Sequence, residues 1–354
     1  MPEIGAHQLE VAETLIGVGR FLVIFVAARL LAELLVRLQL PTILGELIAG
    51  VIIGASGLHL IVPPDTQAAV SQGLLQLVGS LADIPPDAVA QIYAESFPSL
   101  QTVAGLGLFA LLFLTGLESD LDELVAVGAQ ATTVAVAGVA LPFALGTAGL
   151  MALFHVEVIP AVFAGASMTA TSIGITASVF GELKMLRSRE GQIVIGAAVL
   201  DDILGIVILA VVVSLAGGGS LAIGPILKLV VAAVVFVVAA IGLSRTAAPA
   251  FDWLIDRLQA PGDVAVASFV VLTLCCFAAT AIGLEAALGA FAAGLILSKS
   301  NHSHAIEAAV KPVVALFATI FFVLIGTGMD LSVLNPLDPA NRPGLVVAGF
   351  LLLV

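Results

Sequence analysis

Residues 191–215 read GQIVIGAAVLDDILGIVILAVVVSL, an apolar stretch in which the charged residues are Asp201 and Asp202, near its middle. A helix needs about 20 mostly apolar residues to cross a bilayer, and this stretch is long enough. A carboxylate at the bilayer centre costs about 2.5 to 3.5 kcal/mol on insertion scales. Such residues persist where they face a water-filled cavity and bind something. The stretch therefore predicts a membrane helix that carries a functional site at mid-depth.

The composition indicates a membrane protein throughout. Hydrophobic residues make up 60% of the 354 positions and charged residues 10%, whereas soluble domains have about 45 to 50% and about 25%. The net charge of −13 argues against a nucleic-acid partner. We expect about ten complete spans and the start of an eleventh at Pro343, in an all-α polytopic fold. The ten windows are 12–37, 41–58, 99–117, 124–154, 159–182, 191–216, 221–244, 263–283, 284–299 and 306–329.

Basic residues predict the orientation of the spans, because cytoplasmic loops collect Lys and Arg. The basic residues at the ends of spans fall on one side if the N-terminus lies outside; they are Arg29, Arg37, Lys184, Arg187, Arg189, Arg245, Arg257 and Lys299. The long connection 59–98 falls on the other side, where it is acidic and contains no basic residue. We therefore expect 59–98 to be an extracytoplasmic acidic loop.

An internal repeat is visible in two pairs of motifs. Leu44-Gly45-x3-Ala49-Gly50 in the second window matches Leu288-Gly289-x3-Ala293-Gly294 in the ninth. Thr115-Gly116-Leu117-Glu118 at the end of the third window matches Thr327-Gly328-Met329-Asp330 at the end of the tenth. The offset of seven spans is odd, so the two copies cross the membrane in opposite directions, as in the inverted repeats of secondary transporters.

Asp201 and Asp202 are candidates for binding a cation and protons. Neighbours on a helix point about 100° apart, so we assign the two carboxylates different roles. Two close carboxylates resist simultaneous ionisation, and their titrations are coupled. A cation stabilises the doubly charged form, and a proton replaces the cation when it leaves. This competition is the minimal chemistry of cation/proton exchange; a pair held by a buried Lys or Arg is the structural alternative.

The segment 167–178 reads SMTATSIGITAS and predicts a break in the span one helix earlier. Thr169, Thr171, Ser172 and Gly174 are mediocre helix formers at the middle of the window. A discontinuous helix exposes backbone carbonyls at the midplane, and hydroxyls add further hard oxygen ligands for Na⁺. The same residue types also pack helices closely, which is the alternative.

Other polar residues carry weaker signals. Glu285 opens the ninth window and is a candidate cation funnel, although solvated carboxylates at an interface are commoner. Glu46 is expected to cap a helix or accept a hydrogen bond, and Lys311 to snorkel toward the surface rather than pair with an aspartate. His302 and His304 are expected to be solvated. Neither a nucleophile and base arrangement nor a metal motif is evident, so we expect neither an enzyme nor a bound cofactor.

Four runs resemble the monovalent cation:proton antiporter-2 family, in particular its bacterial Na⁺/H⁺ antiporter branch. They are LPTILGELIAGVIIGASGL (40–58), LFLTGLESDL (112–121), TATSIGITASVFGELKMLRSREGQIVIGAAVLDDILGIVIL (169–209) and LEAALGAFAAGLILS (284–298). The resemblance covers about residues 20 to 335. The glutathione-gated potassium efflux branch typically has Gln-Asp where this chain has Asp201-Asp202, so the resemblance favours the sodium branch.

The resemblance implies a fold of 13 helices in a homodimer, with a core domain that moves in an elevator-like way against a dimerisation domain. Asp202 then corresponds to the residue that alternately binds Na⁺ and a proton, with Thr171 and Ser172 beside the ion. Thr169 to Ser172 correspond to the first broken helix. Asp201 corresponds to a neighbour that pairs with a lysine in electrogenic members. That lysine is expected beyond Val354, so residues 1–354 form an exchanger domain without the C-terminal part of the core.

The expected function is electrogenic exchange of Na⁺, or of Li⁺ or K⁺, for protons by alternating access. The alternatives are a gated K⁺ efflux system, a Na⁺-coupled solute symporter and a membrane sensor that transports nothing. The expected location is a bacterial inner or internal membrane, where the chain serves pH homeostasis. The expected partners are the bilayer, Na⁺ and H⁺ and a second copy of the chain.

Overall fold

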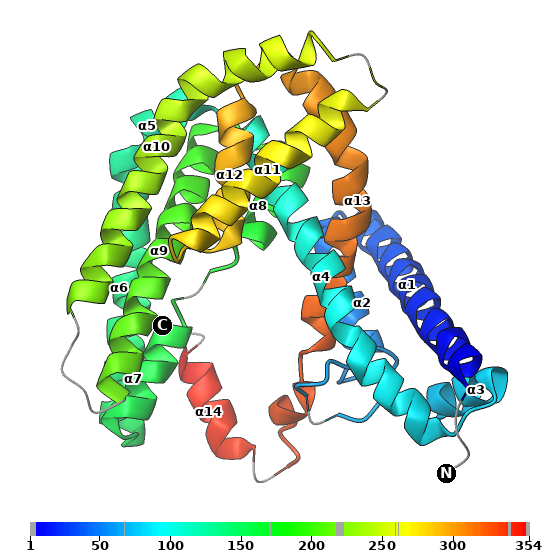
Figure 1. The fold of residues 1–354 in the computed structure, drawn as a ribbon. Helices are drawn as coiled ribbons and strands as arrows, with labels where there is room; N and C mark the ends of the chain where they lie inside the picture. Colours follow the sequence, from blue (N-terminus) through cyan, green and yellow to red (C-terminus); the bar gives the residue numbers. More distant parts are fainter. Residues whose placement is uncertain are drawn as a thin grey trace. The chain divides into compact units, whose positions relative to one another are not determined.

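The computed structural model describes residues 5–66, 68–169, 171–216, 223–258, 260, 262–338 and 341–351. Every regular element in these ranges is helical (Figure 1). The elements in chain order are α1 Ala6–Arg37, α2 Thr42–Ile53, α3 Gln72–Ala82, α4 Pro86–Glu118, α5 Leu121–Ala126, α6 Gly128–Phe154, α7 Val158–Ser167, α8 Ile173–Glu182, α9 Arg189–Ala216, α10 Ile223–Ile255, α11 Asp263–Ala281, α12 Ala286–Leu297, α13 Ser303–Thr327, the 3-10 turn η1 Leu331–Leu334 and α14 Arg342–Leu351.

The described helices confirm a polytopic membrane protein. Five of them, α1, α4, α6, α11 and α13, are long and apolar enough to cross a bilayer. The two arms of α10, which meet at a bend of 51°, form a sixth crossing if they count as one span. The predicted loop 59–98 contains α3 and the first part of α4, which runs through Pro98.

The chain forms two compact units. Unit 1 comprises residues 1–108 and 312–335, and unit 2 comprises residues 109–311 and 336–354. Within unit 1, α1 packs along α2 and α3. Within unit 2, α6 packs on α7 and α9, and α12 packs on α10 and α11. The acidic pair of α9 therefore belongs to unit 2.

The side chains of α1 show how a lipid-facing helix differs from a surface helix of a soluble protein. Its buried side chains recur at every fourth position from Ala12 to Ala32, which places them on one stripe of the helix. The opposite stripe is equally apolar, since Leu22 is 63% exposed and Leu30 is 68% exposed. A helix that is apolar all round is buried in protein or in lipid. The exposed stripe is therefore suited to lipid contact.

Two glycines confirm the predicted repeat at its first helix pair. A Cβ added to Gly45 of α2 would lie 2.7 Å from Ala32 Cα of α1, and a Cβ added to Gly289 of α12 would lie 2.6 Å from Cys276 Cα of α11. Gly45 and Gly289 are 244 residues apart, and Ala32 and Cys276 are separated by the same interval. The pair α1 and α2 in unit 1 is thus repeated by α11 and α12 in unit 2.

The second helix pair of the repeat corrects the register that the motifs predict. A Cβ on Gly50 of α2 would lie 2.7 Å from Gly326 Cα of α13. A Cβ on the equivalent Gly294 of α12 would lie 1.9 Å from the Phe113 carbonyl oxygen of α4. Gly116 of α4 in turn faces α12. The packing therefore matches Gly116 to Gly326, not to Gly328. The shift of two residues arises because the motifs align the ends of the helices, whereas the contacts align their crossing points.

Three predicted windows contain short helices. The second window contains α2 and the ninth contains α12, each with 12 residues. The fifth window, 159–182, is divided into α7 and α8. The interruption predicted between Thr169 and Ser172 is therefore confirmed, with residue 170 outside the described part. The eleventh window begins as α14 at Arg342.

Candidate ion-binding site

The break between α7 and α8 is held by local hydrogen bonds of its own hydroxyls. Thr169 is buried and donates to the Ala166 carbonyl at 2.8 Å. Ser172 is the N-cap of α8, and its Oγ accepts a bond from the Ile175 amide at 3.4 Å. An N-cap hydroxyl satisfies one of the free amides at a helix start. Two helix ends thus meet within one window of the sequence.

Thr171 connects this break to Asp201. Its hydroxyl and its backbone amide both hydrogen-bond the Asp201 carboxylate, which is buried on α9. The Oδ2 atom of Asp201 is buried and has no partner among the described residues. A buried carboxylate oxygen without a donor is costly unless a proton or a cation occupies it. Asp201 is therefore positioned by α8 while one of its oxygens is left for another ligand.

Asp202 lies half-buried on the next position of α9. It interacts electrostatically with Glu285 and with Asp201. Glu285 is the N-cap of α12 and is exposed, and its side chain makes no capping bond. Two helices thus bring three carboxylates into one region of unit 2. Repulsion between like charges favours binding of a cation or a proton.

The structure assigns the predicted residues to different contacts. Asp201, Asp202 and Glu285 come together, and Thr171 contacts Asp201. Ser172 caps α8, and Thr169 bonds its own helix. Participation of Thr171 and Ser172 in binding Na⁺ at Asp202 stays a prediction. The described part of the chain contains no cluster of three His, Cys, Asp or Glu side chains with metal-ligand geometry.

Elsewhere in unit 2, Lys311 and Arg187 form ion pairs or hydrogen bonds. Lys311 pairs with Glu307 of its own helix and with Glu118 of α4 at 3.4 Å, while 53% of its side chain is exposed. The Arg187 Nε donates to the Glu118 carbonyl at 3.0 Å. Lys311 therefore snorkels and pairs with glutamates, as expected. In unit 1, Glu46 accepts a bond from Thr319 at 2.7 Å, so its predicted hydrogen-bonding role is confirmed.

The prediction that His302 is solvated is wrong. Its side chain is 26% exposed, and its two ring nitrogens lie 3.3 Å from Asp252 of α10 and 3.4 Å from Asp256, the residue after α10. Ser300 also bonds Asp252. The 50 residues between Asp252 and His302 hide this contact from any local pattern. His304, whose side chain is 91% exposed, is solvated as expected.

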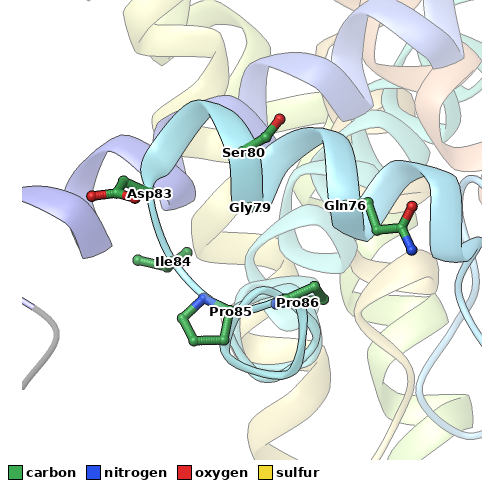
Figure 2. A pocket seen from close by; sticks show the side chains of 7 residues that line it. All are labelled: Gln76, Gly79, Ser80, Asp83, Ile84, Pro85 and Pro86. Atoms are coloured by element: carbon green, nitrogen blue, oxygen red, sulfur yellow. The ribbon is translucent and has the colours of Figure 1, made fainter. Parts of the chain in front are cut away.

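Unit 1 has an open groove of about 400 Å³ at the turn between α3 and α4. Figure 2 shows Gln76 and Ser80 of α3 beside it, with Asp83 at the turn and Pro85 and Pro86 at the start of α4. Asp83 has a left-handed backbone, and its carbonyl accepts a bond from Gln8 at 2.9 Å. A shallow groove of this kind lacks the buried, converging polar groups of a binding site. The acidic site of unit 2 therefore remains the stronger candidate.

Comparison with known proteins gives concordant results. The family model for the transmembrane sodium/hydrogen exchanger matches residues 21–354. The high-affinity Na⁺/H⁺ antiporter NhaS3 of Synechocystis is 46% identical over 333 residues, which are 94% of this chain and 72% of that protein. The Na⁺/H⁺-K⁺ antiporter GerN of Bacillus cereus is 30% identical, with 86% and 69% covered.

One solved structure is similar in fold. The sodium proton antiporter MjNhaP1 of Methanocaldococcus jannaschii aligns with a TM-score of 0.59 at 18% identity, over 95% of this chain and 75% of that one. At this identity the likeness concerns the fold alone.

Proposed function

Since the chain belongs to the sodium/hydrogen exchanger family, we propose that it exchanges a monovalent cation for protons and that the two compete for Asp202. The observation that carries this assignment is the meeting of Asp202 with Asp201 and Glu285 beside the break between α7 and α8. Na⁺ is the leading cation, with Li⁺ and K⁺ as further candidates. Ion exchange, rather than an enzymatic reaction, is the activity.

The exchange follows from charge balance at the acidic pair. When both carboxylates are ionised, Na⁺ offsets their repulsion and takes hard oxygen ligands from Asp202 and from the hydroxyls of Thr171 and Ser172. When Na⁺ leaves, protons take its place on the same oxygens. A carboxyl group that holds either a proton or Na⁺ cannot carry both at once, so the two ions move in opposite directions.

The two aspartates also support an electrogenic stoichiometry. If both carboxyl groups release their protons while one Na⁺ binds, each cycle moves one net charge. The oxygen of Asp201 that has no partner is consistent with a second proton position. Alternating access by an elevator-like movement and a homodimeric assembly complete this proposal. The two compact units and the repeated helix pairs support the alternating-access part of this proposal.

Glu285 supplies the approach to the site. Its exposed carboxylate at the start of α12 attracts cations and interacts with Asp202. Under the positive-inside orientation the N-terminus and this end of α12 face outward, and the protein lies in the inner or an internal bacterial membrane. Glu285 then raises the local concentration of cations at the outer entrance.

The experiment is exchange by the full-length protein in liposomes with an imposed pH gradient. Wild-type protein is expected to release luminal protons when Na⁺ is added, and Asp202→Asn is expected to abolish this flux while the protein remains folded. Asp87→Asn, at an exposed acid in the first turn of α4, is the control and is expected to transport normally. Retained exchange in Asp202→Asn would remove Asp202 from the centre of the mechanism.

A further inference from the structure

Arg20 is a buried cation in unit 1 that the exchange mechanism does not use. It is 5% exposed on α1, its Nη1 donates to Ser96 at 3.0 Å, and its guanidinium lies 3.8 Å from the centre of the Tyr93 ring. Its Nε has no partner among the described residues. Its Nη2 donates to the Tyr93 carbonyl at 2.5 Å, and among the described residues no carboxylate pairs with it. A buried guanidinium is normally paired with an anion.

A cavity of about 220 Å³ opens beside Arg20. Arg20 and Tyr93 are the polar groups of a lining that is otherwise made of apolar side chains of α1, α3 and α4 and of residues 60–61. Leu22 and Leu77 also line it, and both are more than half exposed. The mouth of the cavity thus lies on the lipid-facing side of α1, and its interior presents one cation to an apolar space.

An apolar groove of about 550 Å³ begins where the cavity ends. It shares Leu22 and Val23 with the cavity and follows α1 to Leu31, with Ile52 of α2 on its other side. Helical rise gives this part of α1 a length of about 14 Å. Cavity and groove together therefore have a charged end and a long apolar end.

Arg20 lies within the predicted span, where a buried cation needs a counter-charge. Arg20 is eight residues beyond the start of the predicted span at residue 12, so it lies about 12 Å along α1 from that end. The groove follows α1 away from Arg20, from Leu22 to Leu31, which is the direction that the chain of an anion held at Arg20 would take. The cavity of about 220 Å³ has room for a carboxylate and the first methylene groups of a chain.

We propose that this cavity and groove bind a fatty acid anion, with its carboxylate on Arg20 and its chain along α1 from Leu22 toward Leu31. The planar fork of the guanidinium matches a carboxylate in geometry as well as in charge. The bound carboxylate neutralises the buried cation, and the chain fills the apolar groove. The site lies in unit 1 and is independent of the exchange site.

Photolabelling of the full-length protein in phosphatidylcholine liposomes tests the proposal. The probes are palmitate and hexadecanol that carry the same diazirine in the chain, and labelled peptides are identified by mass spectrometry. In wild-type protein we expect palmitate to label α1 between residues 22 and 31 about tenfold more than hexadecanol, because the charged hydrogen bond distinguishes the two. Equal labelling by the two probes would overturn the proposal.

Two variants test whether the preference for palmitate over hexadecanol depends on Arg20. Arg20→Gln is expected to bring the ratio of palmitate to hexadecanol labelling to about one, whereas Arg29→Gln, at an exposed arginine of the same helix, is expected to keep it at about ten. A ratio that survives Arg20→Gln contradicts the assignment. Labelling that is displaced by unlabelled phosphatidylglycerol but not by unlabelled palmitate also overturns it, in favour of a two-chain lipid. If Arg20→Gln fails to fold, the wild-type comparison still decides the outcome.

Discussion

The starts of α2 and α12 have the same backbone and different chemistry. Pro41, the N-cap of α2, has φ −57° and ψ 139°, and Glu285, the N-cap of α12, has φ −69° and ψ 140°. They are 244 residues apart, the interval that also relates the packed glycines of the two helices. The repeat therefore preserves the close packing and changes the charge. The packing belongs to the scaffold, and the carboxylate of one copy belongs to the ion site.

The largest expected effect comes from breaking the shared packing. Gly50→Ala and Gly294→Ala each add a Cβ that would lie 2.7 Å from backbone atoms, of Gly326 and Leu117 respectively. We expect each to lower the free energy of unfolding by about 3 kcal/mol, since backbone atoms cannot rotate away. Thermal denaturation of the purified protein, followed by its monodispersity, measures the loss.

Gly17→Ala provides the control for this pair. Nothing lies within 4 Å of a Cβ at Gly17, which is inside α1. This substitution is expected to leave stability unchanged or to raise it by about 0.5 to 1 kcal/mol, because alanine is the better helix former. A loss at Gly50 without an equal loss at Gly294 would contradict the equivalence of the two copies.

A smaller effect is expected where the two copies differ. Glu285→Gln keeps the shape of the N-cap and removes the charge that faces Asp202. We expect the KM for Na⁺ to rise about fivefold with kcat nearly unchanged, since one charge in solvent contributes about 1 kcal/mol at short range. Exchange rates at increasing Na⁺ in liposomes give both constants.

Glu285→Asp and added salt test whether the charge of Glu285 accounts for its effect on Na⁺ affinity. The aspartate retains the charge and is expected to restore most of the Na⁺ affinity. High concentrations of choline chloride are expected to reduce the difference between wild type and Glu285→Gln, because salt screens exposed charges. A fall in kcat alone, with KM constant, would argue that Glu285 acts in the transport step instead of in cation capture.

The smallest effect is expected at Cys276, the counterpart of Ala32. Both contact the glycine of the neighbouring helix. Cys276→Ala should therefore change stability by less than about 1 kcal/mol, since the other copy of the repeat accommodates alanine at that position. Thermal denaturation checks this, and a loss as large as that of Gly294→Ala would show that the two copies pack differently at this crossing.

The sequence predicts which residues belong to the site better than it predicts which of them interact. Asp201 and Asp202 stand out because acidic residues are rare at membrane depth, and the break between α7 and α8 is visible as a run of poor helix formers. The interaction of Glu285 with Asp202 is not visible, because it depends on where α12 begins relative to α9. The position of His302 between two aspartates is hidden for the same reason.

The register of the repeat has a similar lesson. The motifs at Gly116 and Gly328 resemble each other as short patterns, yet the close approach of helices selects Gly116 and Gly326. Close packing depends on which residue lies at the crossing point, and a motif at a helix end does not report that. The surroundings of Arg20 are also not visible in the sequence, because an arginine in an apolar span shows neither the Tyr93 ring nor the cavity beside it.

The most direct test of competition between Na⁺ and protons is Na⁺ binding to the full-length protein by calorimetry, over roughly pH 5 to 9. The account predicts that the apparent Kd for Na⁺ rises by about tenfold for each unit of pH below the titration of the site, if one proton competes. It also predicts that binding releases protons into the buffer and that Asp202→Asn eliminates both effects. A Kd that is independent of pH, with no proton release, would contradict it.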